Sequence, residues 1–78
     1  MPRRLRITDH VVTDTHVLGG APVVEGTRVE SSLLASFADD DRAIDGETLR
    51  RLALMFDQVS REALAAALRF EGVNILAA

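Results

Sequence analysis

Apolar residues follow two different patterns along this chain. In residues 5–29 they come as short, mostly β-branched groups separated by glycines and a proline, and in residues 30–72 they recur every three or four positions. The first pattern is typical of short strands joined by tight turns, and the second of amphipathic helices. The sequence therefore predicts one mainly α domain over residues 1–78, with a small N-terminal β element, three helices and a tail over residues 73–78.

The expected β element is organised by its turn residues. Gly19 and Gly20 supply the positive φ angles of a tight hairpin turn, and Gly26 marks a second turn. Pro22 has no N–H, so its strand must lie at an edge of the sheet or begin there. Strands are expected around these turns over residues 5–12, 17–18 and 23–24.

The expected helices cover Ser31–Ala38, Glu47–Phe56 and a third segment that follows the N-cap Ser60 and ends near Glu71, with Gly72 at C′. An acidic loop over residues 39–46 separates the first two helices. Only residues 57–59 separate the last two, which is the spacing of a helix-turn-helix. The second helix carries a clear apolar stripe, formed by Leu49, Leu52, Ala53 and Phe56.

Size and composition indicate dependence on a partner. A domain of 78 residues has a marginal core, and this one has no Cys, hence no disulfide or thiolate metal site. A surface shared with a second copy or another protein is therefore an expected source of stability. No apolar run is long enough to span a bilayer, and the basic N-terminus lacks the apolar segment of a secretion signal, so a cytoplasmic protein is expected.

Several apolar residues lie off the expected core faces and are candidates for a partner or dimer interface. Leu54 points away from the stripe of the second helix and Met55 lies at its margin, while the third helix has an unusually wide apolar arc. The tail is apolar and has two alternatives, packing on the first helix or lying in a partner groove. The full candidate set is Leu54, Met55, Phe70, Ile75 and Leu76.

Catalysis and metal binding find little support. Asp9, His10, Asp14 and His16 are close in sequence, but their spacing matches no established ligand pattern, so turn chemistry by Asp14 and exposed histidines are expected instead. No nucleophile elbow is present, and Gly19-Gly20 lacks the surroundings of a phosphate-binding loop. We therefore expect a binding protein and not an enzyme, with no cofactor and no metal.

One segment carries a family resemblance. The run Gly19-Gly20-x-Pro22-Val23-Val24-x-Gly26-Thr27-Arg28-Val29, preceded by Asp14, resembles the signature of a small prokaryotic family, domain-of-unknown-function family 433. The helical half resembles the family's closing helices, and the likeness extends over roughly residues 7–70. Two departures are visible, namely Thr15 where the family has proline, and the acidic insertion over residues 39–46 in place of a short glycine turn.

The resemblance implies a fold and a function. The family is similar to homeodomain-like helix-turn-helix proteins with a small β element, and its members often act as dimeric antitoxins in VapBC-like pairs. Such a protein would bind a PIN-like ribonuclease toxin, block its nuclease site and repress its own operon through the helix-turn-helix. The alternative is a stand-alone DNA-binding regulator, and a small metal-dependent enzyme is the least favoured reading.

The charged candidates have two interpretations each. Arg28 pairs with an acidic group of the same fold, or it reaches into a carboxylate cluster of the toxin. The basic arm at Arg3, Arg4 and Arg6 enters a minor groove or is a frayed terminus. The net charge of −3 argues against DNA binding by the whole surface. The helical arginines are either DNA contacts or members of a solvated face with ordinary ion pairs, and they are Arg50, Arg51, Arg61 and Arg69.

Overall fold

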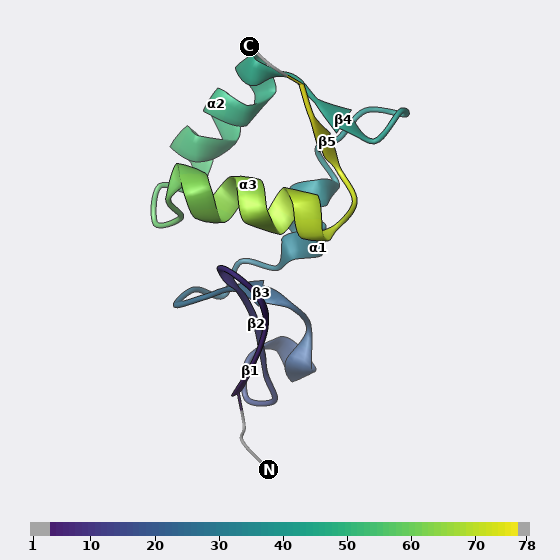
Figure 1. Ribbon diagram of the computed structural model, residues 1–78. Coiled ribbons are helices and arrows are strands. Elements are labelled where there is room, and N and C mark those ends of the chain that lie inside the picture. Colours follow the sequence, from purple (N-terminus) through teal and green to yellow (C-terminus); the bar gives the residue numbers. More distant parts are fainter. Residues whose placement is uncertain (1–3, 77–78) are drawn as a thin grey trace.

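The N-terminal part is a three-stranded antiparallel sheet. The computed structural model describes residues 4–76, in which β1 (Arg4–Thr8) pairs with β2 (Val11–Asp14), and β2 pairs on its other side with β3 (Val23–Val24). The strand order is β1-β2-β3, so β1 and β3 are the edges (Figure 1). This confirms the expected strand at 23–24, and Pro22 directly precedes this edge strand as its missing N–H requires.

Two of the expected strands are wrong. The stretch 5–12 is not one strand, because the chain reverses at Asp9-His10 and His10 takes a positive φ of 70°. Residues 17–18 form no strand either, since Leu18 begins a short 3-10 turn, η1 (Leu18–Gly20). The glycines of this turn do adopt positive φ, 65° for Gly19 and 90° for Gly20, but η1 lies within the longer connection between β2 and β3 and not in a tight hairpin turn.

Three helices form, and the two caps predicted for the third helix are confirmed. The helices are α1 (Ser31–Ala35), α2 (Gly46–Met55) and α3 (Arg61–Phe70). The Ser60 hydroxyl accepts the N–H of Ala63, and Gly72, with φ of 81°, ends α3 in a Schellman motif whose Val73 N–H donates to the Leu68 carbonyl. α1 is shorter than expected, because its last predicted turn tightens to hydrogen bonds between residues three apart. No helix within residues 4–76 has the length and apolar character needed to cross a membrane.

The acidic stretch after α1 is folded and not an open loop. The Asp39 carboxylate accepts the N–H groups of Asp41 and Ala43, both at 2.9 Å. This turn leads into β4 (Ala43–Ile44), which pairs in parallel with β5 (Asn74–Ile75). The tail therefore pairs, through β5, with the segment that was expected to be an acidic loop. This differs from both expected alternatives, packing on the first helix and lying in a partner groove. Residues 77–78 of that tail lie outside the described part of the chain.

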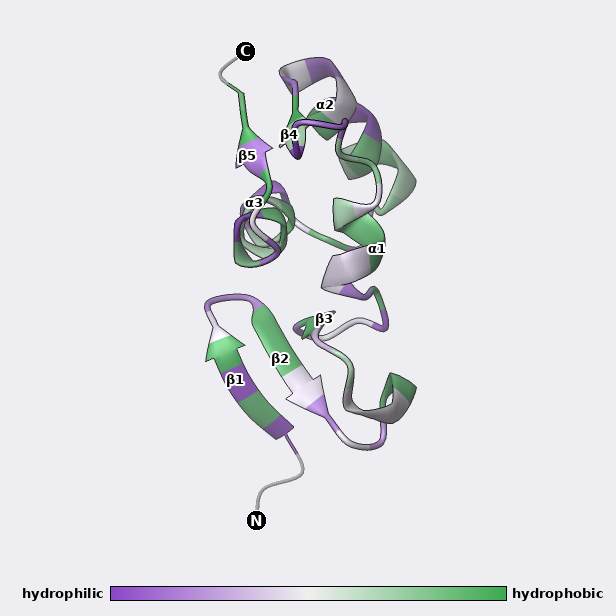
Figure 2. Cartoon of the chain, turned by 90° about the vertical axis from the view of Figure 1, so that its right-hand side faces the viewer, coloured by the Kyte–Doolittle hydropathy of each residue, from purple (hydrophilic) through white to green (hydrophobic). Residues whose placement is uncertain are grey.

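The core forms around α3, which packs against α1, β2, β3 and β5 (Figure 2). Leu64, Ala67 and Leu68 of α3 are fully buried against Val11 and Val24 of the sheet, together with apolar residues of α1, α2 and β4. The predicted fold class is wrong: the molecule is a mixed α/β domain with two sheets, not a mainly α, homeodomain-like three-helix fold. Two-residue strands leave no periodicity in a sequence, so the pattern predicts a loop and a tail where β4 and β5 form.

Candidate functional site

The Gly26-Thr27 turn of the sequence signature is fixed by the chain's own hydrogen bonds. Gly26 has φ of 80°, a left-handed conformation that suits glycine. The Thr27 hydroxyl donates to the Val24 carbonyl at 2.8 Å and accepts the N–H of Val29 at 3.0 Å. The backbone that carries residue 28 is therefore held from both sides.

The earlier half of the signature has structural roles as well. The Pro22 carbonyl accepts the N–H of Ser31, so the entry to β3 is joined to the first turn of α1. Gly19 and Gly20 allow η1 to reverse the chain between β2 and β3. No atom lies within 4 Å of a Cβ placed on either glycine, so both are required for their φ angles and not for space.

Asp14 performs the turn chemistry expected of it. Its side chain is only 2% exposed at the end of β2, where the carboxylate accepts the N–H of His16 at 2.9 Å and its backbone carbonyl accepts the N–H of Val17 at 2.8 Å. The other carboxylate oxygen lies 3.8 Å from a guanidinium nitrogen of Arg4 on the neighbouring strand. His16 is exposed and His10 half-buried. Within residues 4–76, no three His, Cys, Asp or Glu side chains are close enough to hold a metal ion.

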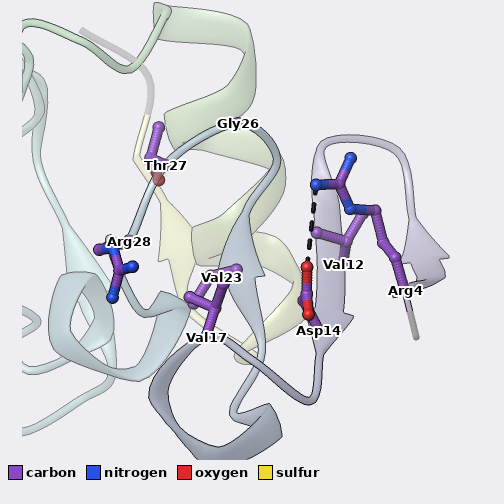
Figure 3. Close-up of a pocket in the computed structure, with 8 residues that line it drawn as sticks. All are labelled: Arg4, Val12, Asp14, Val17, Val23, Gly26, Thr27 and Arg28. Atoms are coloured by element: carbon purple, nitrogen blue, oxygen red, sulfur yellow. Dashed lines mark ion pairs between the residues drawn. The ribbon is translucent and has the colours of Figure 1, made fainter.

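These elements enclose a hollow of about 350 Å³ on the sheet face opposite the core (Figure 3). Val12, Val17 and Val23 form its apolar floor, while Arg4 and Arg28 lie on opposite sides of it. An apolar floor with two cations at the rim suits an aliphatic side chain accompanied by a carboxylate. We call it the signature hollow, and it is lined by Arg4, Val12, Asp14, Val17, Val23, Gly26, Thr27 and Arg28.

Arg28 is the one charged side chain of the signature segment 19–29 that the described part of the chain leaves unengaged, since Glu25 pairs with Arg6. Its side chain is exposed, and no carboxylate within residues 4–76 forms an ion pair with it. Arg28 therefore does not pair with an acidic group of the same fold within residues 4–76, which was the first of its two interpretations. An exposed guanidinium on a rigid turn is preorganised to bind a carboxylate from another molecule.

The comparison with known families gives the identity of the domain. The family model described as a protein of unknown function, DUF433, matches residues 11–70, well over half of the chain. The chain belongs to the DUF433 family. No curated protein sequence and no solved structure matches it. The DUF433 match contains every signature residue of the hollow, but it excludes β1, so Arg4 on the hollow's rim lies outside the matched region.

The helical arginines of this DUF433 protein are placed in two different settings. Arg50 and Arg51 both pair with Glu47, at 2.8 and 3.4 Å, so part of their charge is already compensated. The hydrogen bond from Arg50, and then its positive charge, hold the pKa of Glu47 below its usual value. Arg61 and Arg69 lie exposed on α3, with no ion pair to another residue of the described region.

The apolar interface candidates are exposed to different degrees. Leu54 is 75% exposed and Met55 is 59% exposed at the end of α2, next to Phe56, whose ring meets Phe37 edge to face at 6.3 Å. Phe70 and Leu76 are partly exposed, whereas Ile75 packs against the core from β5. Leu54 and Met55 are therefore the candidates that the fold leaves most open.

Sequence reasoning missed Arg4 as a member of the site. The basic arm is not frayed at Arg4 and Arg6, because both are part of β1, and Arg3 lies outside the described residues. Arg4 reaches the hollow because it stands opposite Asp14 in the β1–β2 register. The alternation Arg-Leu-Arg-Ile before the Val11-Val12 pair is the signal that indicates a separate strand.

Proposed function

We propose that this DUF433 protein is the antitoxin of a type II toxin–antitoxin pair, which binds a PIN-like ribonuclease and inhibits it. One observation carries the proposal: Arg28 extends from a hydrogen-bonded turn, exposed and without an ion pair in residues 4–76. Metal-dependent nucleases hold their metal ions with carboxylates. An arginine that pairs with these carboxylates competes with metal and substrate together.

The signature hollow supports binding of a protein partner. Its valine floor accepts an apolar side chain of the toxin beside the Arg28 contact, which adds burial to a charge-assisted hydrogen bond. A contact of this kind, with an arginine next to an apolar pocket, has the composition of a binding hot spot. Catalytic groups are not needed for this role.

Operator binding is not part of the proposal. The mixed α/β fold removes the homeodomain-like basis on which a recognition helix was expected. Glu47 also forms ion pairs with Arg50 and Arg51. These pairs partly neutralise the positive charge of α2 and so weaken its attraction for phosphates.

The test is to look for a PIN-like ribonuclease encoded next to this gene and to measure whether the protein inhibits it. Wild-type protein is expected to copurify with the nuclease and suppress RNA cleavage. Arg28→Ala should raise the inhibitory concentration at least about tenfold, and Arg28→Lys should recover only part of the loss because an ammonium lacks the guanidinium fork. Arg69→Ala is the matched control, since it also removes an exposed arginine without an ion pair in residues 4–76. Absence of a complex with the wild-type protein rejects the antitoxin role.

The proposal includes a homodimer that buries Leu54 and Met55. These two neighbouring side chains are the most exposed large apolar groups of residues 4–76. Leu54→Glu is expected to lower the mass measured by light scattering to that of one chain, while Arg28-dependent binding persists. Glu62→Gln, an exposed change on α3, is the control. A wild-type mass equal to one chain at high concentration rejects the dimer.

A further inference from the structure

The outer edge of β1 is an unused pairing surface. β1 is the first strand of the sheet, and within residues 4–76 no other strand pairs with its outer side (Figure 2). All five of its residues are exposed, including Leu5 at 55% and Ile7 at 43%. An edge of this kind presents free N–H and C=O groups to any extended segment that matches its side chains.

The register of β1 sorts its side chains by chemistry. Arg4 stands opposite Asp14 and Arg6 opposite Val12, so both arginines belong to the face of the signature hollow. Leu5 stands opposite Thr13, on the other face, which is the face of Val11 and the core. β1 therefore offers cations on one face and an aliphatic group on the other.

We propose that the outer edge of β1 accepts an extended segment of a protein partner in which two acidic residues flank an aliphatic one. Added as a fourth strand, this segment sets its carboxylates beside Arg4 and Arg6 and its aliphatic side chain beside Leu5. The inference deepens the proposed function and rests on it for the identity of the partner, which is then the toxin. The chemistry of the segment follows from β1 alone.

A second copy of this chain is a poor occupant of the same edge. Antiparallel pairing of two β1 strands centred on Leu5 sets Arg4 of each copy opposite Arg6 of the other. Parallel pairing in register repeats the same conflict, and like charges directly opposite one another destabilise a sheet. The shift of register between Arg6 and Thr8 confines regular pairing to the Arg4–Arg6 stretch, so a short acidic segment is sufficient.

The existing ion pair of Arg6 does not block this use. Arg6 and Glu25 approach to 2.6 Å, but both side chains are substantially exposed, and pairs of this kind contribute little. A guanidinium has five N–H donors, so Arg6 can keep Glu25 and accept a second carboxylate. Arg4 is 3.8 Å from Asp14 and is likewise exposed on its outer side.

The test uses the isotope-labelled full chain and short blocked peptides, monitored by NMR up to about 1 mM peptide. The probe is Gly-Glu-Val-Glu-Gly. It is expected to shift the amide signals of β1 and to slow the hydrogen exchange of those amides in the Arg4–Arg6 stretch that face away from β2, with no effect on α3. The same residues in the order Gly-Val-Glu-Glu-Gly should bind at least about tenfold more weakly, because this order cannot place both carboxylates on one face.

Gain of a new ligand separates recognition from folding damage, because the swapped residues face Asp14 and Glu25 and a displaced β1 would bind neither peptide. The double variant Arg4→Glu, Arg6→Glu is expected to lose the acidic peptide and to gain Gly-Lys-Val-Lys-Gly with a similar affinity. Failure of the acidic peptide to bind wild-type protein overturns the inference. Equal binding of the shuffled peptide overturns it too, because attraction without register is then sufficient.

The toxin gives an independent arm. If the toxin is inhibited normally by the charge-swapped variant but not by Arg28→Ala, the proposed function stands and the β1 inference falls. If the acidic peptide binds in register but no nuclease is inhibited, the β1 surface stands and the antitoxin role falls. If the protein binds duplex DNA more tightly than the acidic peptide, the inference that this edge binds a protein segment is wrong.

Discussion

The Ser31 hydroxyl donates a hydrogen bond of 2.5 Å to a carboxylate oxygen of Glu71, and so joins the first turn of α1 to the end of α3. Ser31 is completely buried, and the backbone carbonyl of Glu71 also accepts a guanidinium N–H from Arg42. The first turn of α1 and the segment at Arg42 are thus both held at the C-terminal end of α3. This contact connects the helical half to the entry of the signature turn, since the Ser31 N–H donates to Pro22.

Ser31→Ala is expected to lower the free energy of unfolding by about 1.5–3 kcal/mol, the usual range for a hydrogen bond to a charged group. Urea denaturation followed by circular dichroism measures the change. Ser32→Ala is the matched control, because Ser32 is exposed and its hydroxyl lies 3.4 Å from Glu30. A loss of equal size in both variants would show that the contact with Glu71 contributes nothing specific.

Leu52→Ala and Leu54→Ala should differ strongly although they change the same residue type on one helix. Leu52 is 1% exposed within the core, whereas Leu54 is 75% exposed. Leu52→Ala should cost about 2–5 kcal/mol, since it leaves a cavity. Leu54→Ala should stay within about 0.5 kcal/mol when measured at protein concentrations too low for self-association. Similar values for the two variants would contradict the assigned core face of α2.

Gly26→Ala tests the turn that carries Arg28. No atom lies within 4 Å of an added Cβ, so the cost comes from the positive φ of 80° alone and should be about 1 kcal/mol. Gly26→Asn should cost less, because asparagine tolerates the left-handed region. Chemical denaturation of both variants gives the comparison, and an Asn variant less stable than the Ala variant would refute the conformational explanation.

Asp45 should make the stability of the protein depend on pH. Its carboxylate accepts the N–H of Thr48 at 2.8 Å, and this hydrogen bond is the main cause that lowers the pKa of Asp45 from its ordinary value of 3.8. A depressed pKa means that the contribution is fully present above that ordinary value and is lost as the pH falls through the lower folded value.

Thermal melts of wild type and Asp45→Ala at about pH 7 and about pH 2 measure this effect. At neutral pH the wild type should melt at a higher temperature than Asp45→Ala. The difference in melting temperature between the two proteins should become smaller at acidic pH. Asp40→Ala serves as the control, because no hydrogen bond of the Asp40 carboxylate is formed within residues 4–76. An unchanged difference at both pH values would contradict the role of the ionised cap.

Local chemistry was predictable from the sequence. The caps of α3, the apolar stripe of α2 and the turn at Gly26-Thr27 depend on residues within a few positions of one another, and all three are present as expected. The family followed from the same signature run, and the match over residues 11–70 confirms it.

Pairing between distant segments was not predictable in this way. Two-residue strands such as β4 and β5 have too little length for any alternation to be visible. The reversal at Asp9-His10 places its positive φ on His10 and not on a glycine, so Asp9 is the one turn residue of the usual kind that marks it. Arg4 joins the signature hollow only through the β1–β2 register, which is a property of the assembled sheet.

At the Gly26-Thr27-Arg28 turn, the residues that fix the backbone are different from the residue whose side chain is exposed, and this has an evolutionary consequence. Gly26 and Thr27 secure the backbone, while the side chain of residue 28 contributes no ion pair within residues 4–76. A single codon can therefore be exchanged without disturbing the scaffold. Under the proposed antitoxin role, duplicated genes would diverge in toxin choice at that position first, and cross-reaction between duplicated toxin–antitoxin pairs would follow the residue found there.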